Sequence, residues 1–125
     1  MVAAAGRATK VRRTLLRASV TAAAAARLTR RSRESLERFR RAGQVIALRE
    51  GNEWRYPRWQ FDVDAPGGIV SGLRRVLREL RLSCAGAAYW LSRRHPRLRA
   101  VPIRVLRSGR VDDVLEAARA VGERV

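Results

Sequence analysis

The sequence contains few of the residues on which enzymes and metal sites depend. Its 125 residues include one cysteine and one histidine, so it has no cysteine pair for an internal disulfide and no multi-cysteine zinc site. A single histidine also argues against His-based metal catalysis and a Ser-His-Asp triad. No glycine-rich phosphate loop is present, and no apolar run approaches the ~18 residues of a membrane span. We therefore expect a binding protein with no catalytic residue, no metal, no cofactor and no membrane segment.

Acidic residues are also scarce, most of all in the first part of the chain. The sequence has 11 acidic against 28 basic residues, for a formal net charge of +17, and Glu34 is its first acid. Residues 1–48 hold 12 basic and 2 acidic residues, whereas residues 110–125 hold 3 basic and 4 acidic ones. Arginines that pair with phosphates release condensed counterions. The front half therefore suits a polyanion, and the less basic tail suits a different partner.

The length fits one compact domain, or two small units that share a core. We divide the chain into a flexible basic arm at 1–18, a DNA-binding unit at 19–62 and a helical unit at 63–125. Two alternatives for the arm are an organellar transit peptide, which is similarly rich in arginine and free of acids, and a secretory signal. Against the secretory signal, Arg17 interrupts the apolar run that it needs. The boundary at 62/63 falls in a stretch rich in proline, glycine and aspartate.

Two short helices joined by a polar break are predicted in the second unit. The alanine-rich run at 21–28 is a strong helix former with Thr21 or Ser19 as its N-cap. Ser32 is placed to cap a second helix over 33–41, and Gly43 is placed to end it in a left-handed turn. This pattern predicts a helix-turn-helix unit.

A β-hairpin is predicted directly after these helices. Extended runs at 44–49 and 53–56 flank a Gly-Asn turn signal, and Pro57 ends the second run. A hairpin that follows the second helix of such a unit is a wing. Four aromatic residues in and after it could stack bases of a single strand, but we favour a core role because the proline bends the last two beneath the hairpin. They are Trp54, Tyr56, Trp59 and Phe61.

The rest of the chain is predicted to be helical. Apolar residues recur at helical spacing over 69–82 and 85–92, and Pro102 can open a short helix that ends at Gly109. A capping box at 113–116 predicts the last helix. The expected fold is mainly α, with a helix-turn-helix and a small β-hairpin wing followed by an α-helical unit.

Two motifs carry a family resemblance. The first is Tyr-Pro-Arg-Trp-Gln-Phe-Asp at 56–62, and the second is Pro-Ile-Arg-Val-Leu-Arg-Ser-Gly at 102–109. With Val-Leu-Glu-Ala-Ala at 114–118, they resemble the Xre/MbcA/ParS-like antitoxin family over about residues 20–121. The resemblance implies a partner toxin of the RES-domain type, which degrades NAD. It also implies that the C-terminal region occludes the toxin's active site and that the helix-turn-helix binds the operator.

The chain departs from the family pattern in three places. The Leu-Gly-Gly-like turn before the proline motif is here replaced by Leu-Arg-Ala-Val at 98–101, so the resemblance does not define this loop. Val105 stands in place of a second leucine, which is a tolerable apolar exchange. The basic arm at 1–18 is not explained by the resemblance.

The second helix and its flanks supply the predicted DNA contacts. In a major groove, its exposed side chains would reach base edges, and the arginines at 41, 49 and 55 would hold phosphates. The alternative is an ordinary solvated face in which the two glutamates balance helix charge. The predicted DNA-binding residues are Arg30, Arg31, Arg33, Glu34, Glu37, Arg38, Arg41, Arg49 and Arg55.

The C-terminal segment supplies the predicted toxin contacts. An enzyme that binds an anionic dinucleotide needs a cationic pocket, which a less basic tail can enter. A buried apolar centre would supply most of the affinity. The alternative is ordinary protein surface. The predicted toxin-binding residues are Leu106, Arg110, Val111, Asp112, Asp113, Val114, Glu116 and Arg119.

These observations predict a cytoplasmic antitoxin of a type II toxin–antitoxin system, which neutralises a RES-domain toxin and represses its own operon. In the toxin complex it is expected to form a homo-oligomer, so that two recognition helices meet adjacent operator half-sites. Two other functions fit the sequence: a stand-alone helix-turn-helix regulator, and a nonspecific nucleic-acid-binding protein driven by the basic arm.

Overall fold

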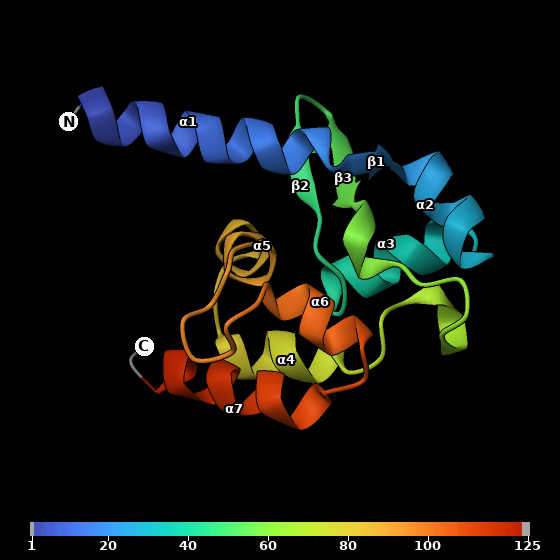
Figure 1. Ribbon diagram of the computed structural model, residues 1–125. Coiled ribbons are helices and arrows are strands. Elements are labelled where there is room, and N and C mark those ends of the chain that lie inside the picture. Colours follow the sequence, from blue (N-terminus) through green and yellow to red (C-terminus); the bar gives the residue numbers. More distant parts are fainter. Residues whose placement is uncertain (1, 124–125) are drawn as a thin grey trace.

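The computed structural model describes residues 2–123, and over these residues the protein is mainly helical with a small three-stranded antiparallel sheet (Figure 1). The mainly helical class predicted from the sequence is confirmed. The first elements are α1 (Val2–Arg17), β1 (Ser19–Thr21), α2 (Ala22–Thr29), α3 (Arg33–Arg41), β2 (Leu48–Glu50), β3 (Glu53–Pro57) and the 3₁₀ helix η1 (Arg58–Gln60). They are followed by the 3₁₀ helix η2 (Pro66–Gly68), α4 (Leu73–Leu80), α5 (Cys84–Ser92), α6 (Pro102–Arg107) and α7 (Val111–Gly122).

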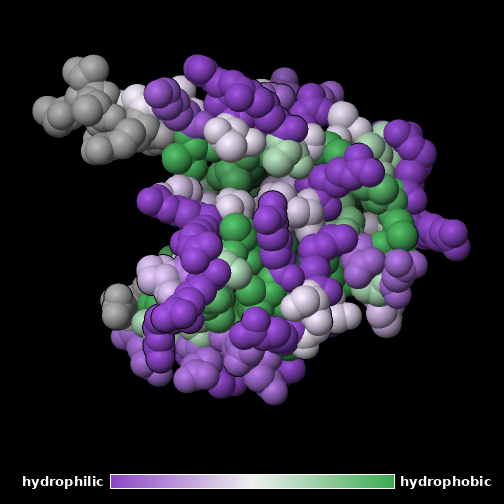
Figure 2. All heavy atoms as spheres, in the orientation of Figure 1, coloured by the Kyte–Doolittle hydropathy of each residue, from purple (hydrophilic) through white to green (hydrophobic). Residues whose placement is uncertain are grey.

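Residues 2–17 form the helix α1, where the sequence predicts a flexible arm. The residues at 11, 15 and 16 give this helix one apolar side. Leu15 is buried in the main core, and Val11 and Leu16 pack against it. In Figure 2, hydrophilic residues cover the outer side of α1 and apolar residues show beneath it. Arg12 ties α1 to the hairpin by donating to the main-chain carbonyl of Arg49. The helix is therefore part of the fold.

Both predicted N-caps in the α2–α3 pair are confirmed. The Ala24 N–H donates to Thr21 Oγ1 at 3.1 Å, and the Ser35 N–H donates to Ser32 Oγ at 3.0 Å. Such caps satisfy amide groups that have no partner within the helix. Gly43 follows α3 with φ +70°, as predicted. The caps therefore fix where each helix begins, and with it which side chains α3 exposes.

The predicted hairpin is present, and a third strand joins it. β2 and β3 pair antiparallel, with Arg49 opposite Trp54. On the other edge of β3, Val20 of β1 lies opposite Tyr56, which gives the strand order β1-β3-β2. β1 was not predicted, because three residues are too few to show the alternation of apolar and polar side chains that is typical of a strand. β1 leads directly into α2, so the sheet holds the start of that helix.

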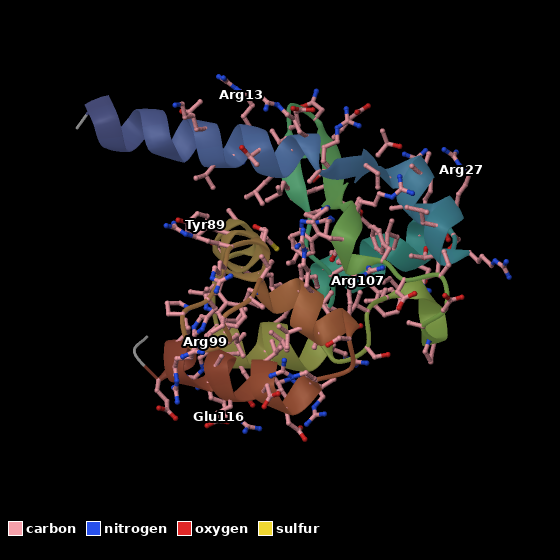
Figure 3. All side chains as sticks on the ribbon, in the orientation of Figure 1. Arg13, Arg27, Tyr89, Arg99, Arg107 and Glu116 are labelled. Carbon is pink, nitrogen blue, oxygen red and sulfur yellow. The ribbon has the colours of Figure 1, made fainter. Side chains whose placement is uncertain are left out.

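A buried glutamine fastens the segment before β2 to the segment after β3. The side chain of Gln60 is fully buried, and its Oε1 accepts from the Ile46 N–H at 2.8 Å. Its Nε2 donates to the carbonyls of Ile46 at 2.8 Å and Pro57 at 3.0 Å. Nearby, Arg107 Nη1 donates to the carbonyl of Phe61 at 2.8 Å and so ties α6 to the same segment (Figure 3). Hydrogen bonds from Gln60 and Arg107 therefore fix the segments on either side of the hairpin.

The helices of the back half differ from the prediction at two starting points. α4 begins at Leu73 rather than Ile69, because Gly72 takes a left-handed conformation (φ +88°) directly before it. α7 begins at Val111, so the predicted capping box at 113–116 is wrong. Asp113 lies in the first turn of α7, where its carboxylate accepts from Arg110 Nε at 2.8 Å. The turn after α6 is completed at Gly109 (φ +94°), and helical backbone resumes at Val111, two residues before Asp113.

The apolar residues form two clusters that do not follow the predicted boundary at residue 62. The larger cluster joins α4–α7 and also takes in Leu15, Ile46 and Leu48 from the front half. The smaller cluster lies between α2, α3 and the sheet. Ile69 packs against both clusters. The two halves therefore share one continuous apolar interior.

Among residues 2–123, no helix combines the length and the apolar character that crossing a membrane requires.

Candidate nucleic-acid interface

The exposed side of α3 carries four of the nine predicted DNA-binding residues. Arg33, Glu34, Arg38 and Arg41 are all exposed on this helix. Arg30, in the turn before it, is exposed and takes a left-handed conformation with φ 55°. The structure therefore gathers three arginines and one glutamate of α3 on its outer side, with a fourth arginine in the adjoining turn.

A groove of about 570 Å³ lies between α3 and the hairpin. Its floor is formed by the start of α2, and its walls carry charges of both signs. The charged lining residues are Arg33, Glu34, Glu37, Glu53 and Arg55. Because carboxylates outnumber guanidinium groups there, the groove itself does not favour a phosphate. A phosphate contact would therefore use the arginines of α3 that do not line the groove, Arg38 and Arg41, whereas Arg33 and Glu34 present polar groups at the groove itself.

Glu37 forms ion pairs within α3 and does not point freely outward. Its carboxylate pairs with Arg40, whose Nε donates to Oε2 at 3.2 Å, and Arg41 Nε lies 3.4 Å from Oε1. The hydrogen bond from Arg40 holds the pKa of Glu37 below its ordinary value. The guanidinium of Arg40 in turn lies 4.0 Å from the ring centroid of Trp54, a cation–π contact. Glu37 therefore positions Arg40 against the hairpin.

Three other predicted DNA-binding residues make contacts within the protein. Arg31 Nε donates to the Gly67 carbonyl at 3.0 Å, and its guanidinium lies 4.3 Å from the Phe39 ring centroid. Arg55 pairs with two carboxylates of the hairpin, at 3.2 and 3.1 Å. Arg49 lies 5.2 Å from the ring centroid of Trp54. These contacts hold the hairpin and the turns in place, so Arg31 and Arg55 are less available to a phosphate than Arg33 and Arg38.

The predicted toxin-binding residues divide between core and surface. Leu106 and Val114 are 1% and 0% exposed, so their assignment to a contact surface is wrong: they fill the main core. Asp112 and Glu116 are exposed on α7, and Figure 3 shows Glu116 on the outer side of that helix. Val111 is half-buried.

The two predicted arginines at this surface are both exposed and both paired. Arg110 bonds to Asp113 within α7, as described above. Arg119 Nε lies 3.7 Å from Glu79 Oε1 and so links α7 to α4. The predicted site therefore presents the exposed carboxylates of α7, Asp112 and Glu116, to a partner.

The sequence analysis did not assign Asn52 and Trp54 to the groove, although both line it. Trp54 packs against the smaller cluster, as its predicted core role requires, yet it is only half-buried. The sequence signal for a groove-lining role was a tryptophan two residues after the hairpin turn. Its partner Arg40 lies 14 positions earlier in the chain, and local sequence could not identify it.

Within residues 2–123, no three histidine, cysteine, aspartate or glutamate side chains gather in a way that could hold a metal ion. No family model, no curated protein and no solved structure matches the chain. The resemblance to the antitoxin family therefore depends on the motifs at 56–62 and 102–109.

Proposed function

We propose that the protein binds duplex DNA as a winged helix-turn-helix, with α3 in the major groove and the β2–β3 hairpin as the wing. The order β1, α2, α3, β2, β3, with β1 paired to β3, supports this proposal. In such units the second helix of the pair enters the groove, and here that helix is α3. α1 is the exception, because it packs on α5 and the sheet rather than on α2 and α3.

The exposed side of α3 is the observation that carries the proposal. Arg33 and Arg38 are exposed there and, among the described residues, neither is in an ion pair. Arginine is the commonest side chain in specific base contacts, where it bonds to guanine in the major groove. Glu34, which is also unpaired within residues 2–123, can accept a hydrogen bond from cytosine. The surface therefore combines cations for the backbone with polar groups for bases.

A pair of double variants tests the proposal. We expect Arg33→Gln with Arg38→Gln to weaken binding to the protein's preferred duplex, identified by selection from random sequences, by about 10- to 100-fold and to reduce the sequence preference. Fluorescence anisotropy at fixed salt measures both. The control is Arg75→Gln with Arg78→Gln, the same charge change on the exposed side of α4. If both doubles weaken every duplex equally, the protein is a nonspecific basic binder and the proposal is wrong.

The acidic side of α7 supports a second function. We propose that the protein is also an antitoxin, and that Asp112 and Glu116 contact the cationic active-site region of a RES-domain toxin. Both side chains are exposed, and within the described residues neither is in an ion pair. On a chain of net charge +17, such a surface is one that a cationic enzyme would not repel.

Charge reversal at one position tests the antitoxin proposal. Glu116→Lys is expected to weaken co-purification with the product of the adjacent gene by at least about 10-fold, because a lysine would face a cationic pocket. Asp64→Lys is the control, since Asp64 is exposed on the loop before η2, away from α7. Equal retention of the partner by wild type and Glu116→Lys would show that this side of α7 is not the contact.

A further inference from the structure

A hollow beside α2 brings together three arginines from neighbouring elements. Arg27 lies in the last turn of α2, Arg30 follows that helix, and Arg58 begins η1. They line one hollow of about 380 Å³. The hollow shares no lining residue with the groove beside α3. Figure 3 shows Arg27 at the outer side of α2. Two of its three arginines, Arg27 and Arg58, thus lie outside the surface proposed to read DNA bases.

The three arginines have no counter-charge within the described part of the chain. All three are exposed, no carboxylate lines the hollow, and none of the three forms an ion pair with a described residue. Arg40, Arg41 and Arg55, by contrast, are each paired with glutamates. Gathering like charges without a partner disfavours the folded state. An anion that entered the hollow would relieve this repulsion.

The chemistry of the lining defines the class of anion. Guanidinium groups match phosphate oxygens because they donate parallel hydrogen bonds in a fixed plane. The remaining lining is apolar and includes Val20, Leu28 and Val63. Val63 is 72% exposed, more than any other large apolar side chain among the described residues. A bare inorganic anion would leave it uncovered, whereas a sugar or base attached to a phosphate would lie against it.

We propose that this hollow binds the phosphate group of a nucleotide, with Arg27, Arg30 and Arg58 around the phosphate and the apolar lining against the sugar or base. The nucleotide can be free or part of a nucleic-acid strand, since both present the same group. The proposal does not depend on the α3 surface, because Arg27 and Arg58 lie outside that surface.

Adenosine 5′-monophosphate is a suitable probe, and adenosine, which lacks the phosphate, is the control compound. In titration calorimetry on the full chain, we expect Arg27→Gln with Arg58→Gln to weaken binding of the monophosphate by at least about 10-fold, because two charge-assisted contacts are lost. The α4 double, Arg75→Gln with Arg78→Gln, should bind like wild type. Adenosine should bind none of the three proteins. Equal binding of the monophosphate by both doubles, or no binding to wild type, overturns the proposal.

Duplex DNA distinguishes the two sources of phosphate. If the hollow holds a strand, Arg27→Gln with Arg58→Gln should lower the salt dependence of duplex binding by about two phosphate contacts. If the ligand is a free nucleotide, duplex binding should match wild type while monophosphate binding is lost. The double Arg33→Gln with Arg38→Gln should retain monophosphate binding in either case, so failure of the DNA proposal remains distinguishable from failure of this one.

Discussion

Replacing Gln60 by methionine is expected to lower the free energy of unfolding by about 3–5 kcal/mol. Methionine fills a similar volume, but it removes the hydrogen bonds to Ile46 and Pro57 described above. The Ile46 N–H and two carbonyls would then be buried without partners, and each such group costs about 1–3 kcal/mol. The melting temperature should fall by roughly 10–20 °C. Urea unfolding followed by circular dichroism measures the change.

The same substitution at the only other glutamine supplies the control. Gln44 is half-buried, and its side-chain amide lies beside the Arg74 guanidinium. Gln44→Met should therefore cost less than about 1 kcal/mol, because water can replace the lost partner. A loss below 1 kcal/mol for Gln60→Met as well would mean that the glutamine does not fasten the hairpin.

Replacing Gly68 by alanine is expected to cost about 3 kcal/mol or more. Gly68 has φ +76°, and a Cβ added there would lie 2.7 Å from the Cα of Thr29 in α2. The clash is with backbone, which cannot rotate away, so η2 would have to move off α2. Arg31, which donates to the Gly67 carbonyl, would lose its anchor at the same time. Denaturant unfolding measures the stability, and binding to the preferred duplex reports whether the α2–α3 turn has shifted.

Gly43→Ala separates the two causes of this loss. Gly43 has a similar φ of +70°, but no atom lies within 4 Å of an added Cβ. It should therefore show the left-handed penalty alone, about 1 kcal/mol. If Gly68→Ala costs no more than Gly43→Ala, the approach of η2 to α2 contributes nothing to stability.

The features that could be predicted from the sequence are those that local chemistry determines. Thr21 and Ser32 cap their helices because a short hydroxyl side chain can reach amides three residues on. Gly51 and Asn52 form the hairpin turn, where Gly51 has φ +61° and glycine adopts such values without strain. Each of these signals lies within four residues of its effect.

The features that could not be predicted depend on contacts between distant residues. Strand β1 exists because β3 offers it an edge, and nothing in Ser19–Thr21 alone indicates pairing. α1 is held by the burial of Leu15 against helices that come some 70 residues later. The role of Gln60 depends on Ile46, which lies across the hairpin. A glutamine in an aromatic-rich motif gave no sign that it would be fully buried.

The candidate site was predicted in part for the same reason. Glu34 and Arg38 are exposed because helical spacing places them opposite Leu36. That spacing is visible in the sequence, and Arg33 is exposed at the first position of α3. Leu106 and Val114 were assigned to a contact surface although they are core residues. An apolar residue that faces a partner and one that faces the interior look alike in a sequence. Only the packing of α7 on α4 and of α6 on α5 and α7 distinguishes them.

The shared apolar interior bears on how this protein can be re-engineered or recombined. Leu15, Ile46 and Leu48 are buried among side chains of residues 63–123. Residues 2–62 therefore cannot be transferred to another protein as an independently folding domain. Fused to a different protein, this segment would expose these three aliphatic side chains to solvent, which promotes aggregation. The back half, separated from it, would be left with a matching void. The contributions of the two surfaces are therefore best resolved by surface substitutions in the intact chain, since truncation would confuse loss of recognition with loss of folding.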